Sequence, residues 1–263
     1  MGVQPDWLAA REPADAAARE TTASTLLPAL LEHLDRCGPA EVVEFIDLGA
    51  GTGANQRWLR PRFPRPQRWI HLDHDPAILR HAYGTEATTA VVGGLDRLPG
   101  LIGRAAHPVL TCSALLDVLS GDQLDRLCSV VITTGTPALF SLSVTGEWHL
   151  TPADPLDPVI ARAFDDHQRR GGRVGPDAPA LVVRRMRAGG LPVRAVPTPW
   201  VLTPADDPAF VRRFLTERVA AATEQDPPLA GAAARWLARR LAHPPDRIVV
   251  GHQDLLILPP PRG

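Results

Sequence analysis

Apolar positions along the chain recur at two spacings, which predict helices and strands in alternation. A helical spacing predicts an amphipathic helix within residues 14–36, ending near residue 37, from Leu26, Leu27, Leu30, Leu31 and Leu34. Short β-branched or aliphatic runs that end in glycines or polar residues then predict five strands. These strands are expected at residues 42–48, 68–75, 87–94, 108–119 and 137–146.

Helical segments separate these strands, at residues 54–63, 76–83 and 121–131. Parallel neighbours need a crossover connection, so this alternation predicts an α/β fold with a doubly wound, mostly parallel sheet and helices on both faces. Beyond residue 146 the pattern predicts four more helices and two more strands. The helices are expected at 157–170, 179–190, 208–223 and 232–243, and the strands at 191–202 and 247–259.

The length of 263 residues fits one domain with embellishments, and the net charge of -1 favours no polyelectrolyte partner. No signal-peptide pattern opens the chain, and no apolar run approaches the roughly 18 residues of a membrane span, so a cytoplasmic protein is expected. Cys37, Cys112 and Cys128 are widely separated, which predicts neither a disulfide framework nor a metal site.

A glycine-rich turn between the first strand and the next helix carries the candidate chemistry, as Asp47-Leu48-Gly49-Ala50-Gly51-Thr52-Gly53. Glycines there let the chain turn sharply and let a ligand approach the main chain. The pattern also fits a dinucleotide site, in which a pyrophosphate lies at the helix N-terminus. Asp47 would repel a pyrophosphate and suits a cationic ligand, which favours S-adenosylmethionine over NAD.

An acidic residue at the end of the second strand is the usual partner of ribose hydroxyls in doubly wound folds. Asp73 stands there, twenty residues after Gly53. Its alternative role is to cap the helix that begins at Pro76, which Asp75 could do equally well. His71 and His74 beside these acids resemble a metal cluster, but alternate side chains of a strand point to opposite faces, so no metal is expected.

The segments EFIDLGAGTG, WIHLDHDPAIL and VLTCSALLDVLS resemble class I S-adenosylmethionine-dependent methyltransferases, over roughly residues 42–146. The resemblance implies a seven-stranded sheet with an antiparallel last strand, beneath an N-terminal helical cap. It implies cofactor contacts from Asp47, Gly49, Ala50, Gly51, Gly53, Asp73, His74, Leu95, Asp96, Cys112 and Ser113. After the third strand the chain departs from the family, which leaves two alternatives for the adenine contact: Asp96 or backbone groups, with Leu95 as an apolar wall.

Candidate catalytic residues come from the second half of the chain. Glu147 and His149 follow the predicted fifth strand, at the edge where catalytic groups belong in such sheets, and His167 ends a predicted helix. Each could bind or deprotonate an acceptor. Asp117 and Ser120 follow the fourth strand and are further substrate-side candidates, although Ser120 is equally a helix cap.

The expected layout is one methyltransferase domain over residues 1–263. Residues 1–40 form the helical cap, 41–146 the cofactor-binding core, and 147–263 the acceptor-side helices and final strands. Trp7, Arg11 and Arg19 in the cap belong either to a lid over the pocket or to a surface helix.

The expected reaction is methyl transfer to a small-molecule acceptor, a carboxylate or hydroxyl compound. The chain lacks the motifs of base methyltransferases and a basic stripe, so nucleic acid is not expected as a partner, and neither is a membrane. Two alternatives stay open: an NAD(P)-dependent oxidoreductase that uses the same glycine turn, and a methyltransferase-like binding protein without activity. A monomer and a homodimer are both compatible with the sequence.

Overall fold

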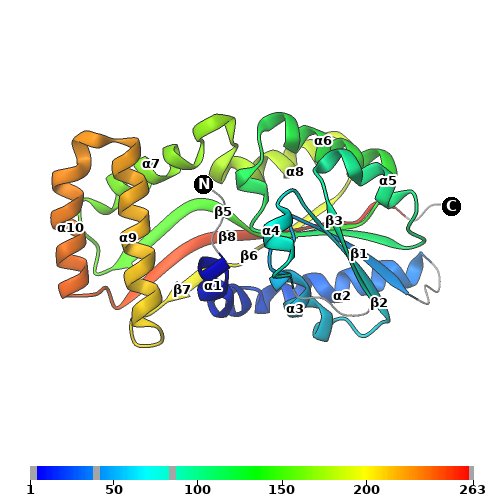
Figure 1. Ribbon diagram of the computed structural model, residues 1–263, viewed down its shortest axis with the longest axis horizontal. Coiled ribbons are helices and arrows are strands. Elements are labelled where there is room, and N and C mark those ends of the chain that lie inside the picture. Colours follow the sequence, from blue (N-terminus) through cyan, green and yellow to red (C-terminus); the bar gives the residue numbers. More distant parts are fainter. Residues whose placement is uncertain (1–4, 38–41, 83–86, 261–263) are drawn as a thin grey trace.

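A single mixed sheet runs through the protein, as Figure 1 shows for the computed structural model, which describes residues 5–37, 42–82 and 87–260. The strands follow the order β3-β2-β1-β4-β5-β8-β6, and a short β7 pairs with β8 off this path. Their bounds are β1 Val43–Leu48, β2 Gln67–Asp73, β3 Thr88–Val92, β4 Pro108–Ser113, β5 Ala138–Thr151, β6 Val193–Pro197, β7 Trp200–Leu202 and β8 Arg247–Ile257.

The first five strands are parallel to one another, whereas β8 is antiparallel to its neighbours β5, β6 and β7. The doubly wound sheet and its antiparallel last strand are therefore confirmed. One predicted strand, at 191–202, is divided into β6 and β7, because Pro199 has no N–H to continue a ladder. Over the described part of the chain the sheet thus has eight strands rather than seven.

Strand β5 is longer than predicted, and this changes where the candidate catalytic residues lie. It continues past Gly146 to Thr151, because β8 is equally long and pairs with it as far as Thr151 and Arg247. Two register shifts, between Phe140 and Ser143 and between Val144 and Trp148, bend the ladder. The prediction that Glu147 and His149 follow the strand is wrong, since both lie within it.

Helices cover both faces of the sheet. On one face, α2 and α3 pack against apolar side chains of β1, β2, β4 and β5, with Leu30, Leu59, Phe45 and Trp69 among the buried residues. On the other face, α5, α6 and α8 pack against the alternate side chains of the same strands. The helices are α1 Pro5–Ala18, α2 Glu20–Arg36, α3 Ala54–Leu59, α4 Pro76–Leu79, α5 Leu98–Ile102, α6 Gly121–Thr134, α7 Asp157–Gln168, α8 Ala178–Ala188, α9 Pro208–Gln225 and α10 Ala230–Ala242.

A third apolar cluster forms beyond the parallel strands, where the ends of β5 and β8 meet β7, α7, α9 and α10 (left in Figure 1). Trp148, Trp200, Phe214 and Trp236 are its largest members. Helix α1 joins it, because Trp7 stacks on Phe210 of α9 at 5.6 Å between ring centroids.

The predicted helix at 14–36 is two helices, α1 and α2, which meet at Arg19. Arg19 has φ −81° and ψ 1°, a turn conformation that redirects the chain. Among the described residues, no helix is both long and apolar enough to cross a membrane, and no three histidine, cysteine, aspartate or glutamate side chains group as metal ligands would.

Candidate functional site

Three glycines between β1 and α3 adopt a backbone conformation that other residues rarely adopt. Gly49, Gly51 and Gly53 have φ angles of +60°, +55° and +74°, in the left-handed region. A Cβ atom is disfavoured in this region, so the turn favours glycine at each position. The turn presents main-chain atoms at the carboxyl edge of the sheet, where ligands of such folds bind.

Asp47 lies fully buried near the end of β1, directly before this turn. Asn55 Nδ2 donates to Asp47 Oδ1 at 2.7 Å and to Thr111 Oγ1 at 3.0 Å, whereas Asp47 Oδ2 has no partner among the described residues. Burial raises the pKa of the Asp47 carboxyl to about 7, and the Asn55 hydrogen bond and the Arg19 charge oppose that shift. Asp47 can therefore accept a further hydrogen bond and can change its charge near neutral pH.

Asp73, at the end of β2, supports the turn directly. Its Oδ2 accepts from the Gly51 amide at 3.0 Å, and its Oδ1 accepts from the Asp75 amide, also at 3.0 Å. Asp75 caps α4 by accepting from the Ala77 amide, so the capping role belongs to Asp75 and not to Asp73. Each carboxylate oxygen can accept two hydrogen bonds, so Asp73 keeps capacity for a ligand.

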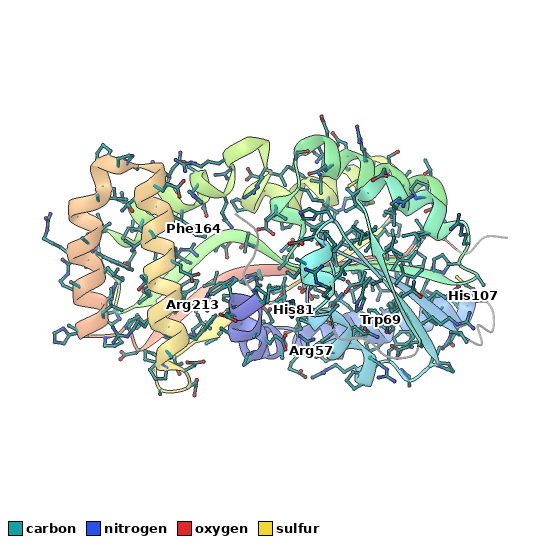
Figure 2. All side chains as sticks on the ribbon, viewed as in Figure 1. Arg57, Trp69, His81, His107, Phe164 and Arg213 are labelled. Carbon is teal, nitrogen blue, oxygen red and sulfur yellow. The ribbon has the colours of Figure 1, made fainter. Side chains whose placement is uncertain are left out.

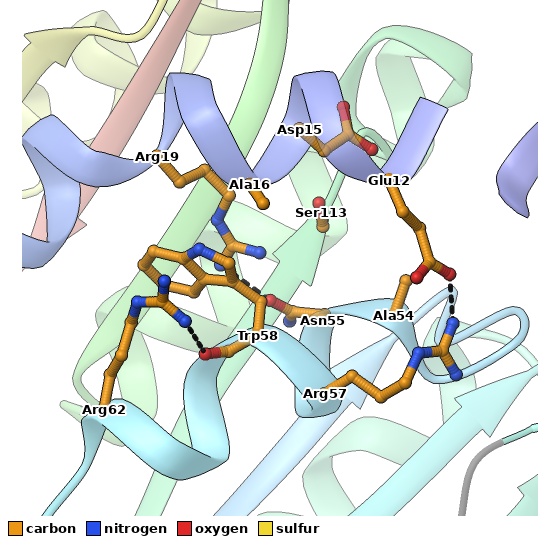
Figure 3. Close-up of a pocket in the computed structure, with 10 residues that line it drawn as sticks. All are labelled: Glu12, Asp15, Ala16, Arg19, Ala54, Asn55, Arg57, Trp58, Arg62 and Ser113. Atoms are coloured by element: carbon orange, nitrogen blue, oxygen red, sulfur yellow. Dashed lines mark hydrogen bonds and ion pairs between the residues drawn. The ribbon is translucent and has the colours of Figure 1, made fainter. Parts of the chain in front are cut away.

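A cavity of about 250 Å³ opens where α1 and α2 meet α3 (Figure 3). Arg19 reaches into it: its guanidinium lies 3.7 Å from the centroid of the Trp58 ring and donates to Asn55 Oδ1 at 2.8 Å and to Ser141 Oγ at 3.3 Å. The lining carries both signs of charge, from Glu12, Asp15, Arg19, Arg57 and Arg62, beside the polar Asn55 and Ser113. The cavity therefore suits a zwitterionic group.

Helix α1 covers the glycine turn. A Cβ atom on Gly51 would lie 3.5 Å from Leu8 Cδ1, and one on Gly49 would lie 2.7 Å from Leu115 Cδ1. Glu12 of α1 forms an ion pair with Arg57 of α3, and Asp15 accepts from Trp200 Nε1 at 3.0 Å. These contacts hold the cap against both the turn and the far end of the sheet.

The remaining predicted cofactor residues lie in different surroundings. Ser113 lines the cavity, whereas Cys112 is fully buried in the core on the opposite face of the sheet. Leu95 is half-buried and Asp96 is exposed, in the short helix that follows β3. The His74 side chain is 90% exposed, and its Nδ1 lies 3.3 Å from Asp73 Oδ1.

The three predicted catalytic residues are not brought together with the turn. Glu147 and His149 are exposed on the extended part of β5. Ser141 pairs with Ser113 at the end of β4, so Glu147 lies six residues further along the strand, at most roughly 20 Å away. His167 ends α7, where its Nε2 lies 3.3 Å from Glu224 Oε2 on α9.

Two residues beside the carboxyl edge hold a strained backbone. Ala114, after β4, and Leu142, in β5, have φ angles of +52° and +54° without being glycine. The Ala114 amide donates to the Ser141 carbonyl at 2.9 Å, and the Leu142 amide donates to Asp254 Oδ1 at 2.6 Å, which holds both residues in place. Such strain concentrates at ligand sites, so both strand ends belong to the candidate site.

A second set of polar side chains comes from η3 (Leu116–Val118), β5, α7 and α9. Each member has a buried oxygen or nitrogen without a partner among the described residues: Asp117 Oδ1, Ser143 Oγ, Thr145 Oγ1, Asp165 Oδ1 and Arg218 Nε. Burial raises the pKa of the Asp117 carboxyl to about 6, against the charges of Arg11 and Arg173. Asp117 can therefore exchange a proton near neutral pH, and it lies only four residues after the end of β4.

Sequence reasoning considered Asp117 but missed most of this group. A signal was available, since serine and threonine alternate with apolar residues in β5, where a fully buried strand would carry aliphatic side chains. Ser120 is resolved as a helix cap: it forms a capping box with Gln123 at the start of α6.

No protein-family model and no curated protein matches the chain. Solved structures do match it. A cyclopropane-fatty-acyl-phospholipid synthase-like protein from Lactobacillus casei superposes with a TM-score of 0.54 at 12% identity, over 93% of this chain and 91% of that chain. A protein described as a methyltransferase from an antibiotic biosynthesis pathway of Anabaena variabilis does so with a TM-score of 0.52 at 12% identity, over 88% and 95%.

Likeness at this level of identity concerns the fold. Among the described strands, β8 runs antiparallel to its neighbours β5 and β6, as the resemblance implied for the last strand. The chain therefore has the fold of the class I S-adenosylmethionine-dependent methyltransferases.

Proposed function

We propose that the protein transfers a methyl group from S-adenosylmethionine to a small-molecule acceptor. The observation that carries this proposal is the turn of three left-handed glycines between two carboxylates, Asp47 and Asp73, in a fold of the methyltransferase type. A buried carboxylate before the turn suits a ligand with an ammonium group and opposes a pyrophosphate.

The residues present fit this cofactor. Its amino-acid end is zwitterionic, and the cavity beside Asn55 is lined by the cations Arg19 and Arg62 and by the anions Glu12 and Asp15, which also pair with Arg57 and Arg11. A volume of about 250 Å³ suits that end of the molecule, while whole drug-sized ligands usually occupy roughly 300–1,000 Å³. Asp73 would then hold the ribose, and Leu95 with Asp96 would lie toward the adenine.

When bound, the cofactor supplies a methyl group on a sulfonium centre. The task of the protein is to align an acceptor with that group and to exclude water, and positioning of this kind supplies much of the rate of such reactions. We assign the shielding to α1 and the acceptor side to the group around Asp117. Asp117 is better placed than Glu147, His149 or His167 to take a proton from the acceptor, because it follows β4 directly.

The decisive experiment is calorimetric titration of the purified chain with S-adenosylmethionine, S-adenosylhomocysteine and NAD. We expect the first two to bind, and Asp73→Ala to weaken them at least tenfold. Asp75→Ala is the matched control, because it removes a neighbouring carboxylate that caps α4 without contacting the turn. Binding of NAD alone would refute the proposal, and binding of the cofactor without turnover of any acceptor would favour the inactive alternative.

A further inference from the structure

Arg218 is a buried cation without a counter-ion in contact. It lies on α9, is 5% exposed, and forms no hydrogen bond or ion pair with a described residue. Three aromatic rings surround its guanidinium, with centroids at 4.0 Å for Phe164, 4.3 Å for Trp148 and 5.4 Å for Phe214. Figure 2 labels Phe164 at the side of α7 that faces α9.

Two other arginines are equally buried and show what the fold normally provides. Arg240, 7% exposed, pairs with both carboxylate oxygens of Asp157 at 3.0 and 3.1 Å. Arg19, 2% exposed, donates to Asn55 and Ser141. A guanidinium removed from water without such partners is unfavourable, and ring faces alone do not replace hydrogen bonds to its edge. Arg218 therefore has donors to offer to a ligand.

The surroundings of Arg218 extend toward the candidate acceptor side. Asp165 of α7 interacts electrostatically with Arg218, and burial raises the pKa of its carboxyl to about 6. Asp165 Oδ2 lies 2.8 Å from the position of a Cβ atom on Gly146, whose φ is +78°. Glycine at this position therefore keeps β5 close to α7. Thr145, next to Gly146, has a buried hydroxyl without a partner among the described residues.

We propose that Arg218 binds the carboxylate of an aromatic monocarboxylic acid, the acceptor of the methyl transfer proposed above. The guanidinium edge pairs with carboxylates in a fork geometry, which accounts for the charge of the ligand. Asp165 disfavours a second negative charge, which distinguishes a carboxylate from a phosphate dianion. The rings of Trp148, Phe164 and Phe214 form an apolar wall that suits a planar ligand.

Strand β5 joins the surroundings of Arg218 to the candidate cofactor site. Gly146 lies five residues beyond Ser141, which pairs with the last residue of β4, so the two are roughly 16 Å apart along the strand at most. The register shift between Val144 and Trp148 shortens that path. With its carboxylate at Arg218, the proposed ligand has its far end directed toward the strand ends of β4 and β5.

The test compares 4-hydroxycinnamate and 4-hydroxybenzoate with their amides, by calorimetry on the full chain with and without S-adenosylhomocysteine. We expect at least one acid to bind about tenfold or more tightly than its amide, because a charge-assisted pair is lost in the amide. Arg218→Met should abolish that preference, and Arg218→Lys should keep part of it. Arg212→Met, an exposed arginine of the same helix, should leave it unchanged.

Two further readouts keep the outcome decisive. The indole N–H resonance of Trp148, assigned with Trp148→Phe, should shift with the acid and not with the amide, which locates binding even if Arg218→Met fails to fold. Equal binding of acids and amides, or a preference that survives in a folded Arg218→Met variant, overturns the proposal. The proposed function fails separately, if S-adenosylhomocysteine does not bind while the acid preference is present.

Discussion

The amide nitrogen of Asn55 lies 2.7 Å from Asp47 Oδ1 and donates a hydrogen bond to it. The same side chain accepts from Arg19 at its Oδ1, so one asparagine joins the buried acid of β1 to the buried base at the start of α2. This link places the cap, the glycine turn and the sheet in one polar network. The protonation state of Asp47 is therefore coupled to the candidate ligand site.

Cofactor binding should release a proton from Asp47. Its carboxyl has a pKa raised to about 7, so part of the population is protonated at pH 6.5, and a nearby ammonium group favours the ionised form. Affinity for S-adenosylmethionine should rise with pH by up to about tenfold per unit and level off above about pH 7. Calorimetry in two buffers of different ionisation enthalpy measures the proton directly. Asp47→Asn should remove the buffer dependence, and a flat pH profile of the wild-type chain contradicts the assignment.

The same pKa shift has a consequence for stability. The folded state holds the Asp47 proton at pH values where the unfolded state has already lost it, since 3.8 is the ordinary value. The Asp47 contribution to the free energy of unfolding should therefore fall as pH rises from about 4 to about 7, and stay constant above. Urea titrations of the wild type and Asp47→Asn across this range, without ligand, isolate that contribution, and parallel pH profiles would refute it.

Gly51→Ala should weaken cofactor binding at least tenfold and leave the fold intact. At φ +55° the new Cβ costs about 1–2 kcal/mol, and its contact of 3.5 Å with Leu8 is an ordinary one, so the loss of affinity comes from the turn surface. Gly121→Ala is the matched control, because a Cβ there meets no atom within 4 Å. Thermal unfolding and calorimetry separate the two effects. Equal affinities of the two variants would show that ligands do not approach Gly51.

Asp254 should be among the most sensitive positions for stability. Its fully buried carboxylate accepts from Thr22 Oγ1 at 2.7 Å, Thr198 Oγ1 at 2.8 Å and the Leu142 amide at 2.6 Å. Asp254→Ala leaves three buried donors unpaired and should lower the free energy of unfolding by about 3 kcal/mol or more. Thr198→Val should lower it by about 1 kcal/mol. Urea denaturation measures both, and a loss under about 1 kcal/mol for Asp254→Ala would contradict this role.

Substitutions of Arg240 and Asp157 should have strongly non-additive effects on the free energy of unfolding. Trp236 Nε1 also donates to Asp157, at 2.8 Å, so the carboxylate joins α7 to α10. Arg240→Met leaves a buried carboxylate with one cation fewer and should cost about 3–5 kcal/mol. The double variant Asp157→Leu, Arg240→Met should recover a large part of that loss, because no buried charge is then left unpaired. Additive losses in a double-mutant cycle would refute it.

Much of the fold follows from local pattern. Strands β1 to β3 and the later helices lie close to their predicted places, because aliphatic runs and helical leucine spacing reflect burial directly. The prediction of a strand over 108–119 is wrong beyond Ser113, where β4 ends, because Leu116–Val118 form a short 3-10 helix. The glycine turn was equally readable, since a left-handed backbone at Gly49, Gly51 and Gly53 leaves little choice of residue. The position of Asp73 at the end of the second strand distinguished it from Asp75 in the sequence. In the structure, Asp73 accepts from the Gly51 amide and Asp75 accepts from the Ala77 amide.

The sequence pattern by itself thus determined the doubly wound sheet and the glycine turn with Asp47 before it, and the resemblance to the methyltransferase family implied the antiparallel last strand. Tertiary structure decided the length of β5, because a strand extends as far as a partner such as β8 offers hydrogen bonds, and this moved Glu147 and His149 away from the turn. It also decided that Arg19 joins the Asp47 network while Arg218 stays unpaired among rings. Such assignments depend on which side chains meet across distant segments, and no local periodicity records that meeting.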